Sequence, residues 1–320
     1  MHDIMQVHRL TAPSSAPLFI NFTQPFSCFE HVDTHFGGLP SLHRCFSLAR
    51  SFASETLIEE QLLPSGIIAQ ENEELASFGL TLGNHDIRRL SFWDRCVASN
   101  DILSLTDETL IGYVILKRDT GIWQGRRIDR WHIFEAVFRK YAHSHNCLPN
   151  AGNYPVRVAD KVFNARGVLY CQQNGLNKAC AHVALRSLLS RLVPDHDVSY
   201  AELNTIAQGC SDSPASYQPS NGLTVQQIRS ILQRYAVDFR DVVYDESCKD
   251  YPNIRKDQPY QKYLYSGIES GVGGLLGFSM GGPEAPQDRH IIPFYGHTFN
   301  KDTWAPDADV SYFNIGANVG

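Results

Sequence analysis

An apolar helix pattern that begins at a cysteine constrains the fold of this chain more than any other feature. Apolar residues recur at helical spacing across residues 180–192, which predicts a helix with one buried stripe. Asn177 stands where it can cap the helix start, so Cys180 falls in the first turn. Unpaired backbone N–H groups and the positive end of the helix dipole favour a thiolate there. The alternative interpretation is a small apolar side chain that packs a helix start.

Helix and strand patterns precede this segment. Two stretches of helix-compatible sequence come first, at 42–56 and 58–63. Apolar runs at 110–118 and 131–141 predict two strands, and the polar stretch between them suits a long hairpin. Three short strands are then expected at 155–158, 161–163 and 168–171, with a turn at 164–167.

Shorter elements follow the cysteine helix. Capping boxes that begin at Ser199 and Thr224 predict two more helices, and residues 237–244 alternate as a strand. Apolar runs at 271–280 and 291–299 are expected to pair as antiparallel strands. These patterns predict an α+β protein with a boundary near 146–154. The division would leave an α+β domain of unknown role at 1–150 and a second domain at 151–320.

The composition excludes several classes of protein. The chain has 320 residues, 43% of them hydrophobic, which is enough for one large domain or two ordinary ones. A net charge of −6 without a charged tail argues against a nucleic-acid partner. No secretory signal is recognised at the first residues, and no apolar stretch approaches the ~20 residues of a membrane span.

The cysteines indicate reduced thiols rather than a disulfide framework or a zinc ribbon. Eight cysteines are scattered through the chain, and none forms a C-x-x-C pair. We therefore predict a cytoplasmic protein without a cofactor. The cluster of His143, His145 and Cys147 has no second half at ligand spacing, so no metal is predicted either.

Three residues carry the chemistry that a cysteine nucleophile requires. Such a thiol needs a histidine that holds it as an ion pair and later protonates the leaving group. It also needs hydrogen-bond donors for the oxyanion, which a side-chain amide and a backbone N–H can supply. Gln173 lies shortly before Cys180, and His290 opens the last predicted strand. His182 points away from Cys180 on the same helix, and the spacing of His297 puts it on the other sheet face.

This order of amide, helix-opening cysteine and strand-opening histidine resembles the papain-like cysteine peptidases. Among them it is most similar to the compact bacterial forms related to bacteriocin-processing leader peptidases. The resemblance covers roughly residues 160–313 and includes the strand from His290 to Gly296. It implies a papain-like helical lobe packed on an antiparallel sheet, behind a separate α+β N-terminal domain.

The resemblance also implies roles for these residues. Cys180 would be the nucleophile, His290 the base and acid, and Gln173 an oxyanion donor. The substrate would be a peptide or protein whose peptide, isopeptide or side-chain amide bond reacts through a thioester. Peptidase, deamidase and acyltransferase activities stay open, because they differ in the group that resolves the thioester. The residue that orients the histidine is left open between Asp302, Asp307 and a position beyond the sequence.

Two other functions are compatible with parts of the sequence. Residues 277–281 fit the G-x-S-x-G pattern, which would make Ser279 the nucleophile of a serine hydrolase. Pro283 and Pro286 interrupt the helix that this motif requires, and too little chain follows for the remaining residues of a triad. The third possibility is a catalytically inactive binding protein with a papain-like shape, in which Cys180 and His290 lie apart.

Overall fold

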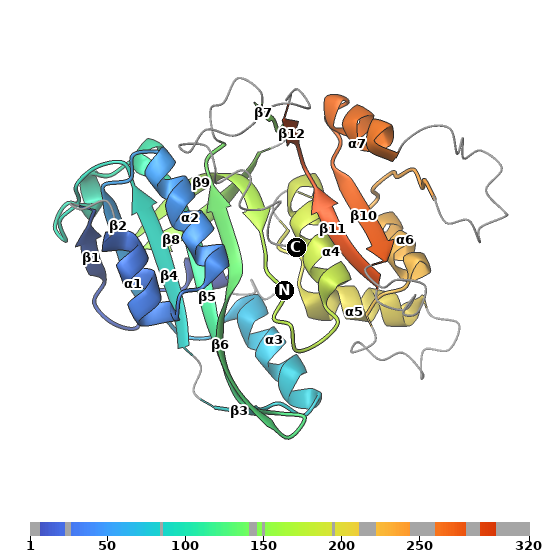
Figure 1. Cartoon of the computed structure of the whole chain (residues 1–320), viewed down its shortest axis with the longest axis horizontal. Helices are drawn as coiled ribbons and strands as arrows, with labels where there is room; N and C mark the ends of the chain where they lie inside the picture. The colour runs from blue at the N-terminus through green and yellow to red at the C-terminus, as the bar shows by residue number, and fades with distance from the viewer. Residues whose placement is uncertain are drawn as a thin grey trace, which may run out of the picture.

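The computed structural model of the chain describes residues 7–22, 27–83, 86–140, 146–148, 151–193, 196–210, 222–243, 260–279 and 289–298. These residues form a large antiparallel sheet beside a group of helices and a two-stranded sheet (Figure 1). The predicted α+β class is therefore confirmed. Within the described residues, no helix has both the length and the apolar character that a membrane span needs.

The large sheet contains eight strands, and each hydrogen-bonded neighbour runs antiparallel. Along the sheet they are β1 (Leu18–Asn21), β2 (Thr56–Leu62), β4 (Asp86–Trp93), β5 (Leu110–Trp123), β6 (Arg126–Phe138), β9 (Lys161–Tyr170) and β8 (Gly152–Val158), with β3 (Thr81–Leu82) beside β5. The predicted hairpin is β5–β6. Gln124 and Gly125 join its strands with φ of 49° and 77°, which is the backbone of a two-residue type I′ turn.

Both faces of this sheet are covered. Helices α1 (Ser27–Phe36) and α2 (Pro40–Ser51) pack on one face through apolar side chains such as Phe46. Helix α3 (Gly66–Ser77) and the β8–β9 hairpin cover the other face. The helix predicted at 58–63 is wrong, because residues 58–62 belong to β2. Leu57 and Ile58 are buried on opposite faces, so a strand covered on both sides lacks the alternation that would identify it.

The helices beyond the sheet have their own apolar core. Helices α4 (Cys180–Leu192), α5 (Tyr200–Gly209) and α6 (Val225–Arg234) enclose Leu185, Leu203 and Ile231. Both predicted helices form. Thr224 makes a complete capping box with Gln227. At Ser199 only half of the predicted box is described, because the Ser199 side chain accepts the Glu202 N–H while the Glu202 carboxylate binds His196. The remaining elements are α7 (Tyr260–Glu269), the antiparallel pair β10 (Gly274–Ser279) and β11 (Arg289–Phe294), and the pair β7 (Asn146–Cys147) and β12 (His297–Thr298).

Two strand predictions are wrong in the described residues. The turn expected at 164–167 lies inside β9, which is continuous, and the hairpin turns instead at Ala159 with φ of 48°. Residues 237–243 form no strand, since the segment leaves α6 without a neighbouring strand to pair with.

The predicted division of the chain near residue 150 falls just before β8. Strands β8 and β9 belong to the same sheet as β6, to which Val168, Leu169 and Tyr170 of β9 are hydrogen-bonded. From Cys171 onward the described chain leaves this sheet. The assignment of 1–150 and 151–320 to two domains stays a prediction.

Candidate functional site

Cys180 is the first residue of α4, as the sequence predicts, and its side chain is partly exposed. The predicted cap is wrong. Ala179 occupies the N-cap position and no side chain caps the helix. Asn177 lies two residues before this position, in a separate turn in which the Asn174 side chain binds the Leu176 and Asn177 N–H groups. The first helical hydrogen bond runs from the Val183 N–H to the Ala179 carbonyl, at 2.9 Å, so the amides at 180–182 precede it.

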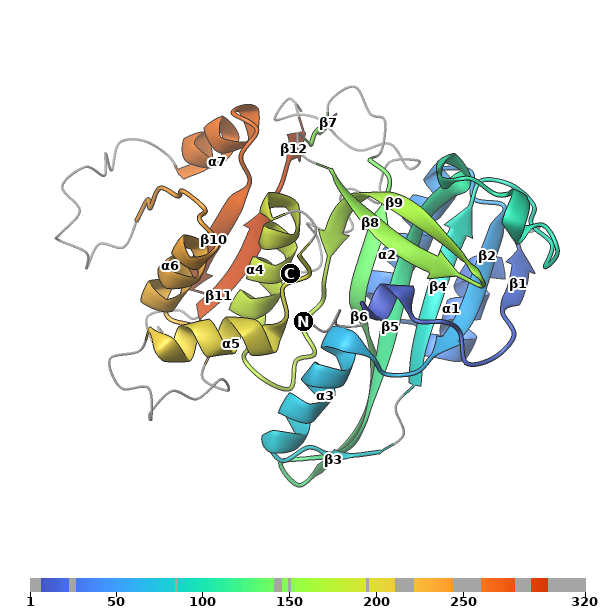
Figure 2. The same cartoon turned by 180° about the vertical axis from the view of Figure 1, so that it is seen from behind.

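His290 is the second residue of β11 and is half-buried. Its register partner is Phe278 of β10, and the two rings meet edge to face with centroids 5.6 Å apart. Helix α4 packs along β11 and β10 (Figure 2). Among the described contacts, none joins the Cys180 thiol to the imidazole of His290. The structure therefore brings their elements together without a direct bond between the two side chains.

Gln173 lies in the segment between β9 and α4 and is half-buried. Its neighbour Gln172 is bound to the large sheet. The Gln172 side-chain oxygen accepts the Ile133 N–H at 3.0 Å and the Ser41 hydroxyl at 3.1 Å. Of the two adjacent amides, Gln173 is consequently the one that is not bound to β6.

The two alternative histidines are held by other groups. His182 is buried in α4, and its Nε2 lies 2.6 Å from Asn204 Oδ1. Burial lowers its pKa. His297 lies in β12, where its Nε2 is 2.6 Å from Glu269 Oε1 and its ring packs on Tyr265.

The His182–Asn204 contact continues to α3, where the Asn204 amide donates to Glu74. Burial, together with the neighbouring Glu71 carboxylate, raises the pKa of Glu74 to about 7 from an ordinary value of 4.5. At pH values between about 4.5 and about 7, Glu74 is therefore protonated in the folded chain and ionised in the unfolded chain.

We expect Glu74→Gln to remove a pH dependence of stability. In the wild type the free energy of unfolding should fall as the pH rises from about 4.5 to about 7. Because Glu74 keeps some solvent contact, the expected loss is about 1–2 kcal/mol. Denaturant unfolding at about pH 5 and about pH 8 measures it, with exposed Glu73→Gln as the control. Equal pH slopes in the wild type and Glu74→Gln would contradict the assignment.

Several predicted positions lie outside the described residues. These are His143, His145, Asp302 and Asp307. Ser279 is the last residue of β10, and residues 280–288 after it are not described, so the context of the G-x-S-x-G motif is untested. Within the described part of the chain, His, Cys, Asp and Glu side chains form no group of three that could hold a metal.

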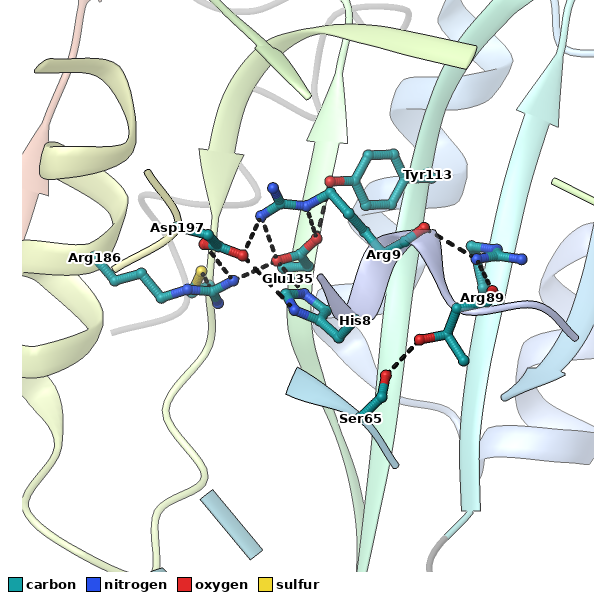
Figure 3. Close-up of polar contacts among 10 residues, drawn as sticks. His8, Arg9, Ser65, Arg89, Tyr113, Glu135, Arg186 and Asp197 are labelled. Atoms are coloured by element: carbon teal, nitrogen blue, oxygen red, sulfur yellow. Dashed lines mark hydrogen bonds and ion pairs between the residues drawn. The ribbon is translucent and has the colours of Figure 1, made fainter. Parts of the chain in front are cut away.

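A buried charge cluster that includes Arg186 of α4 is not predicted from the sequence (Figure 3). Glu135 of β6 is fully buried, and its carboxylate binds His8, Arg9 and Arg186. Asp197 lies 3.1 Å from Arg9 and 3.4 Å from Arg186. One signal was present in the sequence, since Glu135 interrupts an otherwise apolar run at 133–138. Its partners are too distant along the chain for any local pattern to reveal.

Comparisons with protein-family models, with curated proteins and with solved structures found no significant match.

Proposed function

We propose that the chain is a cysteine peptidase-like hydrolase that acts through a thioester on Cys180. The observation that carries the proposal is the position of the thiol. Cys180 is partly exposed at the start of a long helix whose first amides have no side-chain cap. A thiol at such a position faces unpaired backbone N–H groups and the positive end of the helix dipole, which are the donors that an oxyanion at this site would need.

The packing of α4 on β11 supports His290 as the partner of Cys180. Near the end of α4, the Arg191 guanidinium lies 4.9 Å above the ring of Tyr295, which directly follows β11. The distances along the helix from Arg191 back to Cys180, and along the strand from Tyr295 back to His290, are each about 17 Å. Helix and strand lie side by side in both views (Figures 1 and 2). Cys180 and His290 would then lie at the same end of the pair formed by α4 and β11.

The proposed reaction proceeds in two steps. The Cys180 thiolate attacks the carbonyl carbon of the substrate, and the backbone N–H of Cys180 and the Gln173 amide stabilise the oxyanion. The imidazolium of His290 gives its proton to the leaving amine as the carbon–nitrogen bond breaks. Neutral His290 then takes a proton from water, whose oxygen attacks the thioester and releases the acid and the thiolate.

The substrate class is a peptide or protein with a peptide, isopeptide or side-chain amide bond. If an amine rather than water resolves the thioester, the same residues perform acyl transfer. Five cysteines are unpaired in the described part of the chain, namely Cys45, Cys96, Cys171, Cys180 and Cys210, which agrees with a reducing compartment such as the cytoplasm for a protein that depends on a free thiol.

The test is the pH dependence of Cys180 alkylation by iodoacetamide, followed by peptide mass spectrometry. Around pH 6 we expect Cys180 to react at least about tenfold faster than the exposed Cys210, because free thiols have a pKa near 8.5. His290→Ala should abolish this difference, while His297→Ala, the matched control, should keep it. If Cys180 is alkylated at the same rate as Cys210, and this rate does not change in His290→Ala, the proposal is rejected and an inactive binding protein is favoured.

A further inference from the structure

The segment that precedes Cys180 is organised by the side chain of Asn174. This residue is 3% exposed. Its Oδ1 accepts the Leu176 N–H at 2.8 Å and the Asn177 N–H at 3.3 Å. These bonds close a turn in which Gly175 has φ of 61°, a conformation that suits glycine. The turn directs the chain from β9 towards the start of α4.

The other end of the Asn174 amide is tied to α3. Its Nδ2 donates to Glu71 Oε1 at 3.0 Å, and Glu71 is itself buried. The second oxygen of Glu71 accepts a hydrogen bond from Lys117 Nζ at 2.6 Å. Each carboxylate oxygen therefore has its own buried donor, which fixes the orientation of Glu71 and with it the orientation of Asn174.

Charged groups on the β5–β6 hairpin hold Lys117 in place. Its Nζ lies 3.0 Å from Asp119, which in turn lies 3.3 Å from the His132 imidazole. Burial opposes the charge on Lys117, but Glu71 and Asp119 outweigh this effect and raise its pKa. Burial likewise opposes the charge on Asp119, yet His132 and Lys117 lower its pKa to about 2. Lys117 and Asp119 are thus charged at neutral pH.

The backbone of the same segment is attached to β6 on either side of Gln173. The Gln172 N–H donates to the Ile133 carbonyl at 3.0 Å, and the Asn174 carbonyl accepts a hydrogen bond from Arg130. Gln173 is consequently held between two anchored residues. The anchor at Asn174 is the one that also shapes the turn towards Cys180.

From these contacts we infer that Asn174, oriented by Glu71, is a positioning residue for Gln173 and Cys180. The inference rests on the proposed function, because it assigns Asn174 the task of placing the oxyanion donor and the thiol. Asn174 itself touches no reacting atom. A side chain that bonds two amides of the segment and a buried carboxylate of another element couples the site to α3.

An isosteric exchange tests this role. Asn174→Asp places a carboxylate against the Glu71 carboxylate, whereas Asn174→Asp combined with Glu71→Gln restores the bond with donor and acceptor reversed. In the double variant the amide introduced at position 71 donates to the carboxylate introduced at position 174. The oxygen of the same amide accepts the hydrogen bond from Lys117. The total buried charge is the same as in the wild type, because one carboxylate is removed at position 71 and one is added at position 174. Asn164→Asp is the matched control, because Asn164 binds Asp107 in the same way at an exposed position.

Two readouts are followed in each variant: amide hydrogen exchange of peptide 172–179, and the pH profile of Cys180 alkylation. Asn174→Asp should speed exchange and slow alkylation near pH 6, each about tenfold, and the double variant should recover most of both losses. Asn164→Asp should change neither. Wild-type exchange and alkylation in Asn174→Asp, or no recovery in the double variant, would overturn the inference.

The two failures can be told apart. If the pH profile of Cys180 alkylation is the same in the wild type and in His290→Ala, the proposed function is rejected, and with it the catalytic reason for positioning. The exchange measurements would then still decide whether Asn174 and Glu71 hold the segment.

Discussion

Replacing Glu135 with glutamine is expected to lower the free energy of unfolding by about 3–5 kcal/mol. The Glu135 carboxylate is fully buried and lies 3.0 Å from Arg9 Nε and 2.5 Å from Arg186 Nη2. It also lies 2.7 Å from His8 and accepts the Tyr113 hydroxyl at 2.9 Å. When Glu135 is replaced by an uncharged glutamine, the buried guanidinium groups of Arg9 and Arg186 would share the single carboxylate of Asp197.

The same contacts set the sign of the pH effect. Burial alone would raise the pKa of Glu135, but Arg9, His8 and Arg186 outweigh it and hold the pKa well below the usual value. The stabilisation is therefore present above the ordinary carboxyl range and is lost only as the pH falls through the depressed pKa. At neutral pH the wild type therefore has the full stabilisation from the ionised Glu135 carboxylate, and Glu135→Gln lacks it.

Denaturant unfolding near pH 7 measures the difference. The control is Glu202→Gln, which removes a carboxylate 3.0 Å from His196 at the surface and is expected to cost less than about 1 kcal/mol. A cost for Glu135→Gln as small as that of the control would show that the cluster contributes no stability.

Gly167→Ala is expected to destabilise the fold by about 3 kcal/mol. Gly167 lies where β9 leaves its pairing with Gly152 of β8 and begins to pair with β6. A Cβ atom there would overlap the carbonyl oxygen of Phe138 and reach 3.0 Å from the Val137 side chain. Because the first neighbour is backbone in the middle of a sheet, it cannot move aside as a flexible side chain can.

Gly277→Ala in β10 is the matched control for this substitution. The nearest neighbour of its added Cβ is the His290 carbonyl at 4.0 Å, so no rearrangement is needed. We expect its free energy of unfolding to stay within about 1 kcal/mol of the wild type. Equal unfolding free energies for the two alanine variants would refute the close approach of β9 to β6.

The features predicted correctly from the sequence are local ones. The β5–β6 hairpin, the capping box at Thr224 and a helix that begins at Cys180 each depend on neighbours within a few residues. The failures come from tertiary packing. The helix predicted at 58–63 is wrong because β2 is buried on both faces, which removes the alternation of a half-exposed strand.

The candidate site divides in the same way. The position of Cys180 follows from a short apolar pattern, whereas the cap predicted at Asn177 is wrong because the N-cap position is Ala179 and Asn177 lies in the turn that Asn174 closes. The Asn174 partner Glu71 is 103 residues away in the chain, and no spacing rule connects the two. The proposed pairing with His290 likewise depends on how β11 packs against α4, which the resemblance to a family suggested and local sequence could not.

The burial of His8 and Arg9 has a consequence for biosynthesis. Arg9 pairs with Glu135, which is 126 residues later in the chain, and with Asp197, which is later still. At a translation rate of about 5–20 residues per second, Glu135 leaves the ribosome about 6–25 s after Arg9, and Asp197 leaves it later still. The segment with His8 and Arg9 can therefore be buried only after these later partners have been made. A fusion partner attached close to His8 would have to accommodate this late insertion.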